Sequence, residues 1–393
     1  MKINNFNCRI AGYMLLTIAT LSSCSKGGNS PAPVNPGTGT GGTTTPATNT
    51  YATVADSMQS KTYSTYLSAN GNYYVQNNTG NTNFNYWPQA HMLDVLIDAY
   101  LRTKNTVYPQ RMKALLTGLK ATNGGTYTND YYDDMGWMAN ACIRAYTVTN
   151  DADYLTVAQI LYTDIKTGSN NSQGGGIAWR KTQLNYKNSP STTNAIILAA
   201  RIYEVQNNAN DLTLAKSLYS WMKATLVDPT TGVVYDGINS SGTGALDKNV
   251  YTYNQGAFIG AAIELYNATK DQTYLADAVL TANNAITDSR MVSVGVLKSE
   301  GQGDGGLFKG IDVRYLTALT ELSGLDAASS TKFAAFLQNN ALYLYTVGIA
   351  KPTYLAGPDW TQKPTGSVDL TTQLSGMMMM EAAAKLQAER KIK

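Results

Sequence analysis

Two adjacent aspartates, Asp133 and Asp134, are the residues whose type and spacing are best suited to chemistry. Tyr131 and Tyr132 precede them, and the apolar periodicity that follows predicts a helix over residues 132–149. An aspartate at a helix start commonly caps it, and two acids in the first turn also suit the helix dipole. Hydrolysis of a glycosidic bond, however, needs two carboxyl groups, one to protonate the leaving oxygen and one to attack or to activate water. The pair is therefore either a capping feature or a sugar-cleaving centre.

Two other predicted helices align with the helix over residues 132–149 in an internal repeat. The starts of these two helices carry polar residues without charge. These are Ser191, Thr193, Asn194, Asn254 and Gln255. We expect Asn254 and Gln255 to hydrogen-bond sugar hydroxyls, because an uncharged polar rim around one carboxylate pair suits a neutral, hydroxyl-rich ligand.

Tryptophans supply the other feature of a sugar site. Trp87, Trp179 and Trp360 fall on or beside long connections, whereas Trp221 lies in a predicted outer helix and is expected in the core. A loop indole can stack on the apolar face of a pyranose ring, or it can anchor its own loop.

Composition excludes several other functions. The 393 residues carry a net charge of +3, with 15% charged and 43% hydrophobic residues, so no basic face is available for nucleic acid. The single histidine, His91, excludes a multi-histidine metal site, and we expect it to be a hydrogen-bonded residue of the rim. No cofactor or metal is predicted.

Cys142 lies in an apolar helical run and is expected to be buried. Residues 301–306 are glycine-rich, but no preceding strand supports a nucleotide site.

The N-terminus has the pattern of an export signal. Residues 1–23 combine Lys2 and Arg9 with a short apolar stretch, and Leu21–Cys24 resembles the bacterial lipobox, in which the cysteine becomes lipid-modified. Residues 24–50 are almost entirely small and polar, which predicts a flexible tether. We therefore expect Cys24 to anchor the protein to a membrane of the bacterial cell envelope, with a folded domain over residues 51–393.

Helical periodicity dominates that domain. It predicts twelve helices, near residues 52–69, 88–104, 107–121, 132–149, 151–167, 190–207, 210–226, 251–268, 271–288, 309–324, 329–346 and 367–389. Long connections rich in Gly, Asn and aromatics precede every second helix, and tight polar turns separate the others.

An internal repeat indicates how these helices are arranged. The helices that contain Tyr146, Tyr203 and Tyr266 align with spacings of 57 and 63 residues, one helix pair each. The even-numbered helices are apolar nearly all round, so they must be packed on every side. The pattern favours an all-α fold, an (α/α)6 toroid of six inner and six outer helices, over an open superhelical solenoid.

These motifs together resemble glycoside hydrolase family 76. The resemblance rests on Tyr132-Asp133-Asp134 with Trp137, on Arg144-Ala145-Tyr146, on the segments 89–91, 174–180 and 193–195, on Tyr253-Asn254-Gln255-Gly256 and on the segments 308–311 and 314–315. It covers residues 52–326 well and the last two helices weakly. Met135-Gly136 departs from the bulkier or acidic residues that many members carry after the pair.

The resemblance implies a retaining endo-α-1,6-mannanase with an (α/α)6 fold, acting on α-mannan polysaccharide or oligosaccharide. It implies Asp133 as the nucleophile and Asp134 as the acid/base. The residues expected to bind substrate are Trp87, His91, Tyr132, Trp179, Arg180, Asn194, Tyr253, Asn254, Gln255, Lys309 and Arg314. We expect a monomer.

Two other functions fit the bulk features of the chain. A glycan-binding envelope lipoprotein without catalysis would share its aromatic-rich, tethered character, but it would not need two adjacent acids at an inner helix start. A sugar epimerase or an unsaturated-uronide hydrolase could use the same toroid. The single histidine disfavours an epimerase with paired histidines, and uronide recognition would need more basic residues at the rim.

Overall fold

A computed structural model describes residues 50–393. The predicted signal segment, Cys24 and nearly all of the tether lie outside these residues. In the described part of the chain there are twelve α-helices: α1 (Thr50–Tyr66), α2 (Tyr86–Thr103), α3 (Val107–Thr122), α4 (Tyr132–Thr149), α5 (Ala152–Lys166), α6 (Ser189–Gln206), α7 (Ala209–Thr225), α8 (Thr252–Thr269), α9 (Gln272–Ala285), α10 (Gly305–Thr320), α11 (Ala327–Tyr343) and α12 (Leu370–Ala388). None of these helices is both long and apolar enough to cross a membrane.

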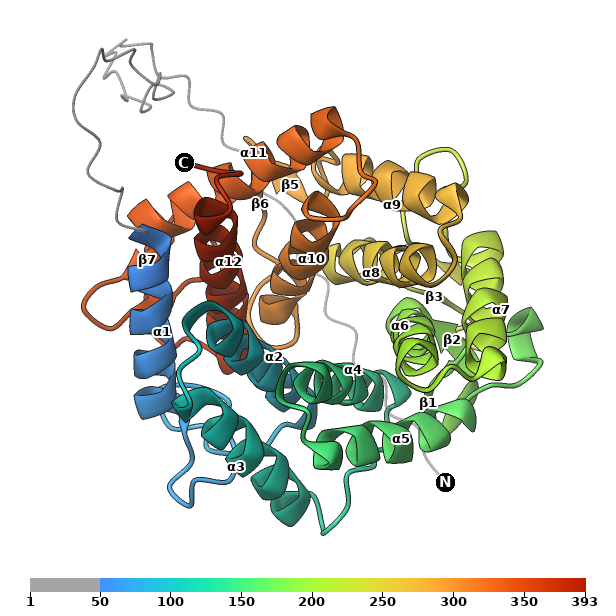
Figure 1. The fold of residues 1–393 in the computed structure, drawn as a ribbon, viewed down its shortest axis with the longest axis horizontal. Helices are drawn as coiled ribbons and strands as arrows, with labels where there is room; N and C mark the ends of the chain where they lie inside the picture. Colours follow the sequence, from blue (N-terminus) through green and yellow to red (C-terminus); the bar gives the residue numbers. More distant parts are fainter. Residues whose placement is uncertain (1–49) are drawn as a thin grey trace, which may run out of the picture. The chain divides into compact units, whose positions relative to one another are not determined.

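The helices form two concentric rings (Figure 1). The even-numbered helices make the inner ring, in which each packs against the next, and the odd-numbered helices cover its outside. The last inner helix, α12, packs against both α1 and α2, so the ring closes. The predicted (α/α)6 toroid is therefore confirmed, and the open solenoid is excluded.

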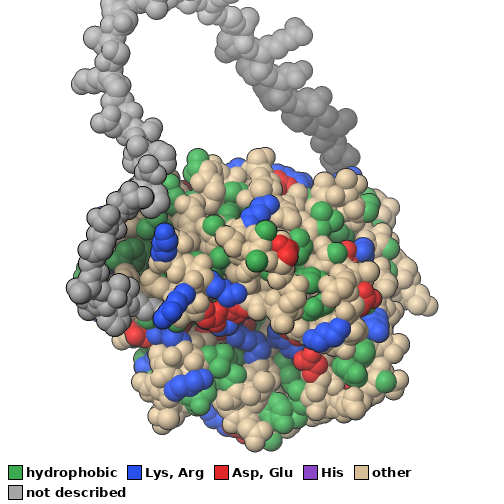
Figure 2. Space-filling view, turned by 45° about the horizontal axis from the view of Figure 1, so that its top comes forward, with side chains coloured by type: hydrophobic (Ala, Val, Ile, Leu, Met, Phe, Trp, Pro, Cys, Tyr) green, Lys and Arg blue, Asp and Glu red, His purple; other side chains and the backbone are tan. Residues whose placement is uncertain are grey.

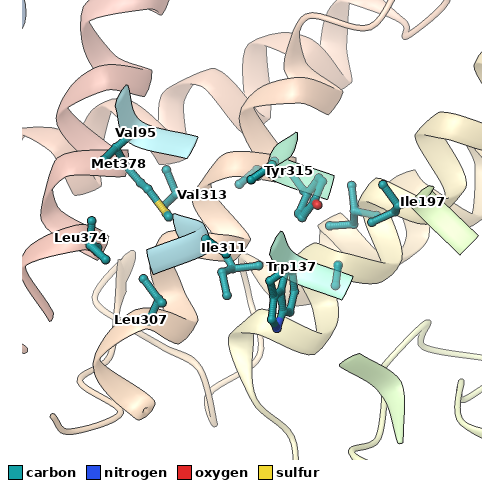
Figure 3. Close-up of a cluster of buried hydrophobic side chains, with 14 of the residues drawn as sticks. Val95, Trp137, Ile197, Leu307, Ile311, Val313, Tyr315, Leu374 and Met378 are labelled. Carbon is teal, nitrogen blue, oxygen red and sulfur yellow. The ribbon is translucent and has the colours of Figure 1, made fainter. Parts of the chain in front are cut away.

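Burial explains which helices lie inside. Along α6 every residue from Ser189 to Ala200 is buried, and α12 is buried almost without interruption from Leu370 to Ala384. Buried apolar side chains lie along several inner helices, among them Val95, Trp137, Ile197 and Ile311 (Figure 3). Helices with no solvent-exposed stripe can be accommodated only where neighbours surround them.

The tight turns between inner and outer helices reuse one local solution. Inner helices α4, α6 and α8 end at a residue with a left-handed backbone, and the next residue caps the following outer helix through its side chain. The residue pairs are Asn150-Asp151, Asn207-Asn208 and Lys270-Asp271. Asparagine and aspartate favour these positions because their short side chains bond to nearby backbone N–H groups.

The long connections contain short strands that the helical periodicity did not predict. These are β1 (Ala178–Arg180), β2 (Gln183–Asn188), β3 (Gly237–Ile238), β4 (Leu246–Asp247), β5 (Val292–Ser293), β6 (Val296–Leu297), β7 (Ile349–Ala350) and β8 (Leu355–Ala356). The first four form one antiparallel sheet in the order β1-β2-β3-β4, which joins the loop before α6 to the loop before α8. The other four make two separate hairpins.

Most predicted helix boundaries agree with the structure to within about three residues, but α10 begins four residues before the predicted start. Its first residues, Gly305 and Gly306, have low helix propensity, so the sequence predicts a later start. A Cβ at Gly305 would overlap the Glu300 carbonyl oxygen, and one at Gly306 would overlap the Thr372 hydroxyl. Glycine occurs at these two positions because the backbone of α10 packs closely on its neighbours there, and it does not mark a loop.

Candidate active site

A cleft of about 550 Å³ lies at the N-terminal ends of the inner helices α2, α4, α8 and α10 and of the segment that leads into α6. Its lining residues are Asn85, Trp87, Tyr131, Asp133, Asp134, Trp137, Trp179, Tyr186, Asn188, Asp236, Tyr253, Asp304 and Phe308. On the face of the molecule shown in Figure 2, basic and acidic side chains are interspersed without a large patch of one sign. The cleft, by contrast, gathers four carboxyl groups, those of Asp133, Asp134, Asp236 and Asp304.

Asp133 and Asp134 lie in the first turn of α4 and border the cleft. The backbone N–H of Asp134 donates to Asp133 Oδ1 at 3.1 Å, and Tyr131, which precedes the helix, makes no side-chain cap. Adjacent positions on a regular helix diverge by about 100°. Both carboxyl groups nevertheless reach the same cleft, because they lie where the chain enters the helix.

The two carboxyl groups of this pair differ in their surroundings. Burial raises the pKa of Asp134 well above its ordinary range, and the charges of Asp133 and Asp304 raise it further. Burial also raises the pKa of Asp133, but hydrogen bonds from backbone N–H groups and from the Asn188 side chain oppose that rise. Asp133 is therefore the first to ionise, and Asp134 holds its proton to higher pH.

Asp236 is a third cleft carboxylate, and sequence reasoning missed it. It accepts hydrogen bonds from Tyr253 Oη at 3.1 Å, Asn254 Nδ2 at 2.9 Å and Tyr186 Oη at 3.3 Å. It directly precedes β3, where Gly237 pairs with Asn188 of β2, so the four-stranded sheet brings it to the cleft. No local pattern marks an aspartate in a long loop as functional, and only the sheet pairing reveals its position.

Asp304 is the fourth carboxylate, and it lies immediately before α10. Its Oδ1 accepts a hydrogen bond from the indole Nε1 of Trp87 at 2.9 Å, which joins the starts of α2 and α10. The sequence around Asp304 gives no nucleotide-binding pattern, and nothing in its glycine-rich composition predicts that it reaches the cleft.

Aromatic rings form the remaining walls. Trp179 lies between Tyr131 and Tyr186, with ring centroids 5.2 and 5.8 Å away, and the Arg180 guanidinium lies 4.6 Å from the Trp179 ring. Tyr253 stacks on Phe308 at 4.0 Å. The structure thus places Trp87, Trp179 and Tyr253 on the cleft as expected, with Arg180 held against its wall.

Tyr132 and His91 are both buried, and neither lines the cleft. The Tyr132 hydroxyl lies 3.0 Å from Thr167 Oγ1. His91 packs between Trp87 and Trp137, with ring centroids 5.4 and 5.0 Å away, and burial lowers its pKa to about 3. Neither of its ring nitrogens has a hydrogen-bond partner within residues 50–393. The prediction that His91 is a hydrogen-bonded residue of the rim is therefore wrong. Its ring instead packs against the buried side of Trp87.

Gln255 and Asn194 also face protein and not the cleft. Gln255 binds the backbone of Val234, accepting from its N–H at 2.9 Å and donating to its carbonyl oxygen at 2.8 Å. Asn194 donates to the Pro190 carbonyl oxygen and accepts from Asn140 Nδ2. The expectation that Gln255 meets sugar hydroxyls is corrected, because both ends of its amide already have partners. Asn254, which holds Asp236, supports the cleft without lining it.

The contact made by Gln255 recurs around the ring, and we call it the amide clamp. Gln89 accepts from the Tyr74 N–H and donates to the Tyr74 carbonyl oxygen, both at 2.9 Å. Gln373 accepts from the Ala356 N–H at 2.8 Å and donates to the Tyr354 carbonyl oxygen at 3.1 Å. Each clamp lies early in an inner helix and grips the loop that leads into that helix.

Lys309 and Arg314 lie further along α10 and away from the cleft. Lys309 is buried, donates to the Pro358 carbonyl oxygen and lies 4.3 Å from the Trp360 ring, which is itself buried. Arg314 donates to Asp98 Oδ2 at 2.8 Å. Contrary to the prediction, neither side chain lines the cleft, because protein groups elsewhere on the ring already hold both of them.

A second cavity, of about 460 Å³, lies among the inner helices, and Trp137 borders both cavities. The cations among its lining residues are ion-paired. Arg144 and Arg314 pair with Asp94 and Asp98, Arg201 with Glu264, Arg102 with Glu381, and Lys385 with Glu321. These charges compensate one another across the inner helices, so each of the cations that line this cavity has a carboxylate partner.

Other groups that could do chemistry are accounted for. Cys142 is buried as expected, and burial raises the pKa of its thiol. Trp221, which was expected in the core, is only partly buried: it packs against the loop at Gly175 and Gly176, and its indole N–H donates to the Gln173 carbonyl oxygen at 2.9 Å. Within residues 50–393, no group of three or more His, Cys, Asp and Glu side chains is placed to hold a metal ion.

A toroid that presents paired carboxyl groups in an aromatic-walled cleft, at the starts of its inner helices, has the architecture and site of a glycoside hydrolase. More specifically, the chain belongs to glycosyl hydrolase family 76, whose sequence profile matches residues 48–392. The resemblance inferred from the sequence is thereby confirmed.

Solved structures agree with this assignment. The GH76A α-1,6-mannanase from Salegentibacter sp. HEL1_6 is 46% identical, with a TM-score of 0.84, over 86% of this chain and 99% of that chain. A variant of the same enzyme with two consecutive aspartates changed to asparagine is described as inactive and was solved with α-1,6-mannotriose, at 45% identity and the same coverage.

Relatives with curated functions are more distant and match in part. The mannan endo-1,6-alpha-mannosidase DCW1 of Candida albicans is 24% identical over 277 residues, which are 65% of this chain and 61% of that enzyme. A relative from Schizosaccharomyces pombe is 27% identical over 201 residues, 46% of its own length. The chain thus spans about half to three fifths of the length of these two relatives.

Proposed function

We propose that this protein is a retaining endo-α-1,6-mannanase that cleaves the backbone of α-mannan. The observation that carries the proposal is the pair Asp133 and Asp134 at the base of the cleft, with unequal surroundings that separate their pKa values. The α-1,6-mannanase relative supports it, because its variant with two consecutive aspartates replaced is described as inactive. The names of the fungal relatives support endo action.

In the proposed reaction Asp133 is the nucleophile and Asp134 the acid/base. The Asp133 carboxylate attacks the anomeric carbon while the Asp134 proton moves to the glycosidic oxygen, so one sugar–oxygen bond breaks as a glycosyl ester forms. Water then attacks that ester, giving its proton to Asp134, and releases the sugar with its original anomeric configuration. Asn188 and the backbone N–H of Asp134 favour the anion that attacks, whereas burial and neighbouring charge favour the protonated acid.

The decisive test is to incubate the purified domain with linear α-1,6-mannan and α-1,6-mannotetraose. We expect a ladder of shorter chains whose new reducing ends are first released in the α configuration, as NMR spectroscopy can follow. Asp133→Asn should abolish turnover. Asp134→Asn should cleave only substrates with good leaving groups, and azide should restore rate to Asp134→Ala. Wild-type-like cleavage by either asparagine variant would refute the assignment and favour a glycan-binding protein without catalysis.

We also propose that the enzyme acts outside the cytoplasm, as a monomer joined to an envelope membrane through lipid on Cys24. The sequence of residues 1–50 is the support for this placement, because it combines a signal-like segment, a lipobox-like cysteine and a tether-like stretch. A tethered hydrolase of this kind could meet mannan that is too large to be imported whole.

A further inference from the structure

We propose that Trp87 and Asp304 form the subsite for the leaving-group sugar, the mannose whose oxygen departs when the glycosidic bond breaks. This inference rests on the proposed function, and it assigns a role to one end of the cleft that the roles of Asp133 and Asp134 leave open. The ligand is a neutral hexopyranose that presents hydroxyl donors to a carboxylate and a ring face to an indole.

Asp304 has an acceptor to spare. It occupies the capping position of α10, yet its side chain does not cap that helix and instead reaches Trp87. Only Oδ1 is used there, at 2.9 Å from the indole nitrogen. Within residues 50–393, Oδ2 makes no hydrogen bond to protein. The residue is exposed and lines the cleft, so Oδ2 can accept from a sugar hydroxyl without first losing another partner.

Trp87 is held rigidly beside this acceptor. The residue is 8% exposed, and its ring meets His91 edge-on at 5.4 Å and 90°, while His91 packs in turn on Trp137. With the bond to Asp304, the indole is fixed both from behind and along its edge. Rigid side chains lose little conformational entropy when a ligand binds, which suits a wall that positions a sugar.

The place of this pair in the ring decides which sugar it would bind. In the inner ring α4 packs between α2 and α6, and Trp87 is on α2. Asp304 precedes α10, which packs against α8 and α12, and it reaches the α2 side through its hydrogen bond with Trp87. Asn188 and Asp236 approach from the α6 and α8 side. The electrostatic neighbours agree: Asp304 acts on Asp134, and Asp236 and Asn188 act on Asp133. An acid must face the oxygen that departs, so the leaving sugar lies on the side of Asp134, with Trp87 and Asp304.

Asp304→Asn tests this assignment, because it keeps an oxygen for the Trp87 indole and replaces the spare acceptor by a donor. Two substrates report separately: α-1,6-mannotetraose, whose leaving group is a sugar, and an aryl α-1,6-mannobioside, whose leaving group is not. We expect kcat/KM to fall about ten- to a hundredfold on mannotetraose, as for a lost charge-assisted hydrogen bond, and to stay within about twofold on the aryl substrate.

Two variants provide the comparison. Asp236→Asn, on the side of Asp133, should impair both substrates alike, whereas Asp153→Asn, exposed on the outer helix α5, should change neither. With mannobiose added as an acceptor, Asp304→Asn should also lower the share of transfer product relative to hydrolysis. Equal losses on both substrates, or no loss on mannotetraose, would overturn the subsite assignment. A wild-type protein inactive on both substrates would instead refute the proposed function itself.

Discussion

Asp312 provides a test of how a buried carboxyl group limits the stability of this ring. It lies on the inner helix α10, has no exposed surface and packs so closely on α8 that a Cβ at Gly256 would lie 2.5 Å from its Cα. Neither carboxyl oxygen has a hydrogen-bond partner within residues 50–393. Burial raises its pKa to about 8, and the charge of Glu300 contributes. We predict that Asp312→Asn stabilises the protein at neutral pH.

The sign and size follow from proton binding. In the unfolded chain an aspartate has a pKa near 3.9, so above about pH 4 the unfolded state releases a proton that folded Asp312 retains until about pH 8. The folded pKa is the higher one, and the free energy of unfolding therefore falls as pH rises through this window, by up to about 1.4 kcal/mol per pH unit. At pH 7 the full effect is about 4 kcal/mol, and structural relaxation reduces it to about 2–4 kcal/mol. Asparagine has nearly the same shape as the neutral aspartic acid, but it does not ionise. The variant therefore avoids this pH-dependent loss of stability.

Urea unfolding followed by far-UV circular dichroism at pH 5, 6, 7 and 8 measures this effect. We expect the free-energy advantage of Asp312→Asn over wild type to grow across the series. Thermal unfolding at pH 7 should give a Tm about 3–6 °C higher. Asp153→Asn is the matched control. It removes an exposed carboxylate that pairs with Lys113, a contact worth less than about 1 kcal/mol. An advantage of Asp312→Asn that is the same at pH 5 and pH 8 would refute the reasoning.

Three other predictions follow from the site and the sequence. Because Asp133 must be ionised and Asp134 protonated, kcat/KM on mannotetraose should rise as pH passes the pKa of Asp133 and fall above that of Asp134, and a flat profile would contradict these roles. Gln255→Ala should cost about 2–5 kcal/mol in urea unfolding, because it leaves two buried backbone groups of one loop unpaired, whereas Asn254→Ala should lower activity more than stability. Equal losses of stability for both would count against the distinction. Cys24→Ala should move the protein from the membrane fraction to the soluble fraction, and a wild-type protein that is already soluble would exclude the anchor.

The fold was predictable because its determinants are local and repeated. Apolar faces recur along each helix, and polar turns recur between helices, so periodicity alone placed α4 over residues 132–149 and indicated the closed ring. The carboxyl pair Asp133 and Asp134 was predictable for the same reason, since its two members are neighbours in sequence at one helix start.

The rest of the site depends on contacts between distant residues. Asp236 and Asp304 lie in loops, and they reach the cleft through pairing with β2 and through a bond to an indole 217 residues away. Gln255 was misassigned because a polar residue at a helix start can face either a ligand or the loop before it, and sequence does not distinguish them. Arg314 was misassigned because its partner, Asp98, lies on another inner helix and becomes apparent only in the folded ring.

The amide clamps bear on how such a scaffold can acquire new specificities. Each of Gln89, Gln255 and Gln373 fixes its loop at one point, 15 to 21 residues before the glutamine. Chain on either side of that point can lengthen, shorten or change composition while the start of the inner helix stays in register. Each loop, together with the glutamine that holds it, is therefore a unit that could be exchanged between related enzymes. Transplanting one such unit is a more promising route to altered sugar selectivity than redesigning all the loops around the cleft at once.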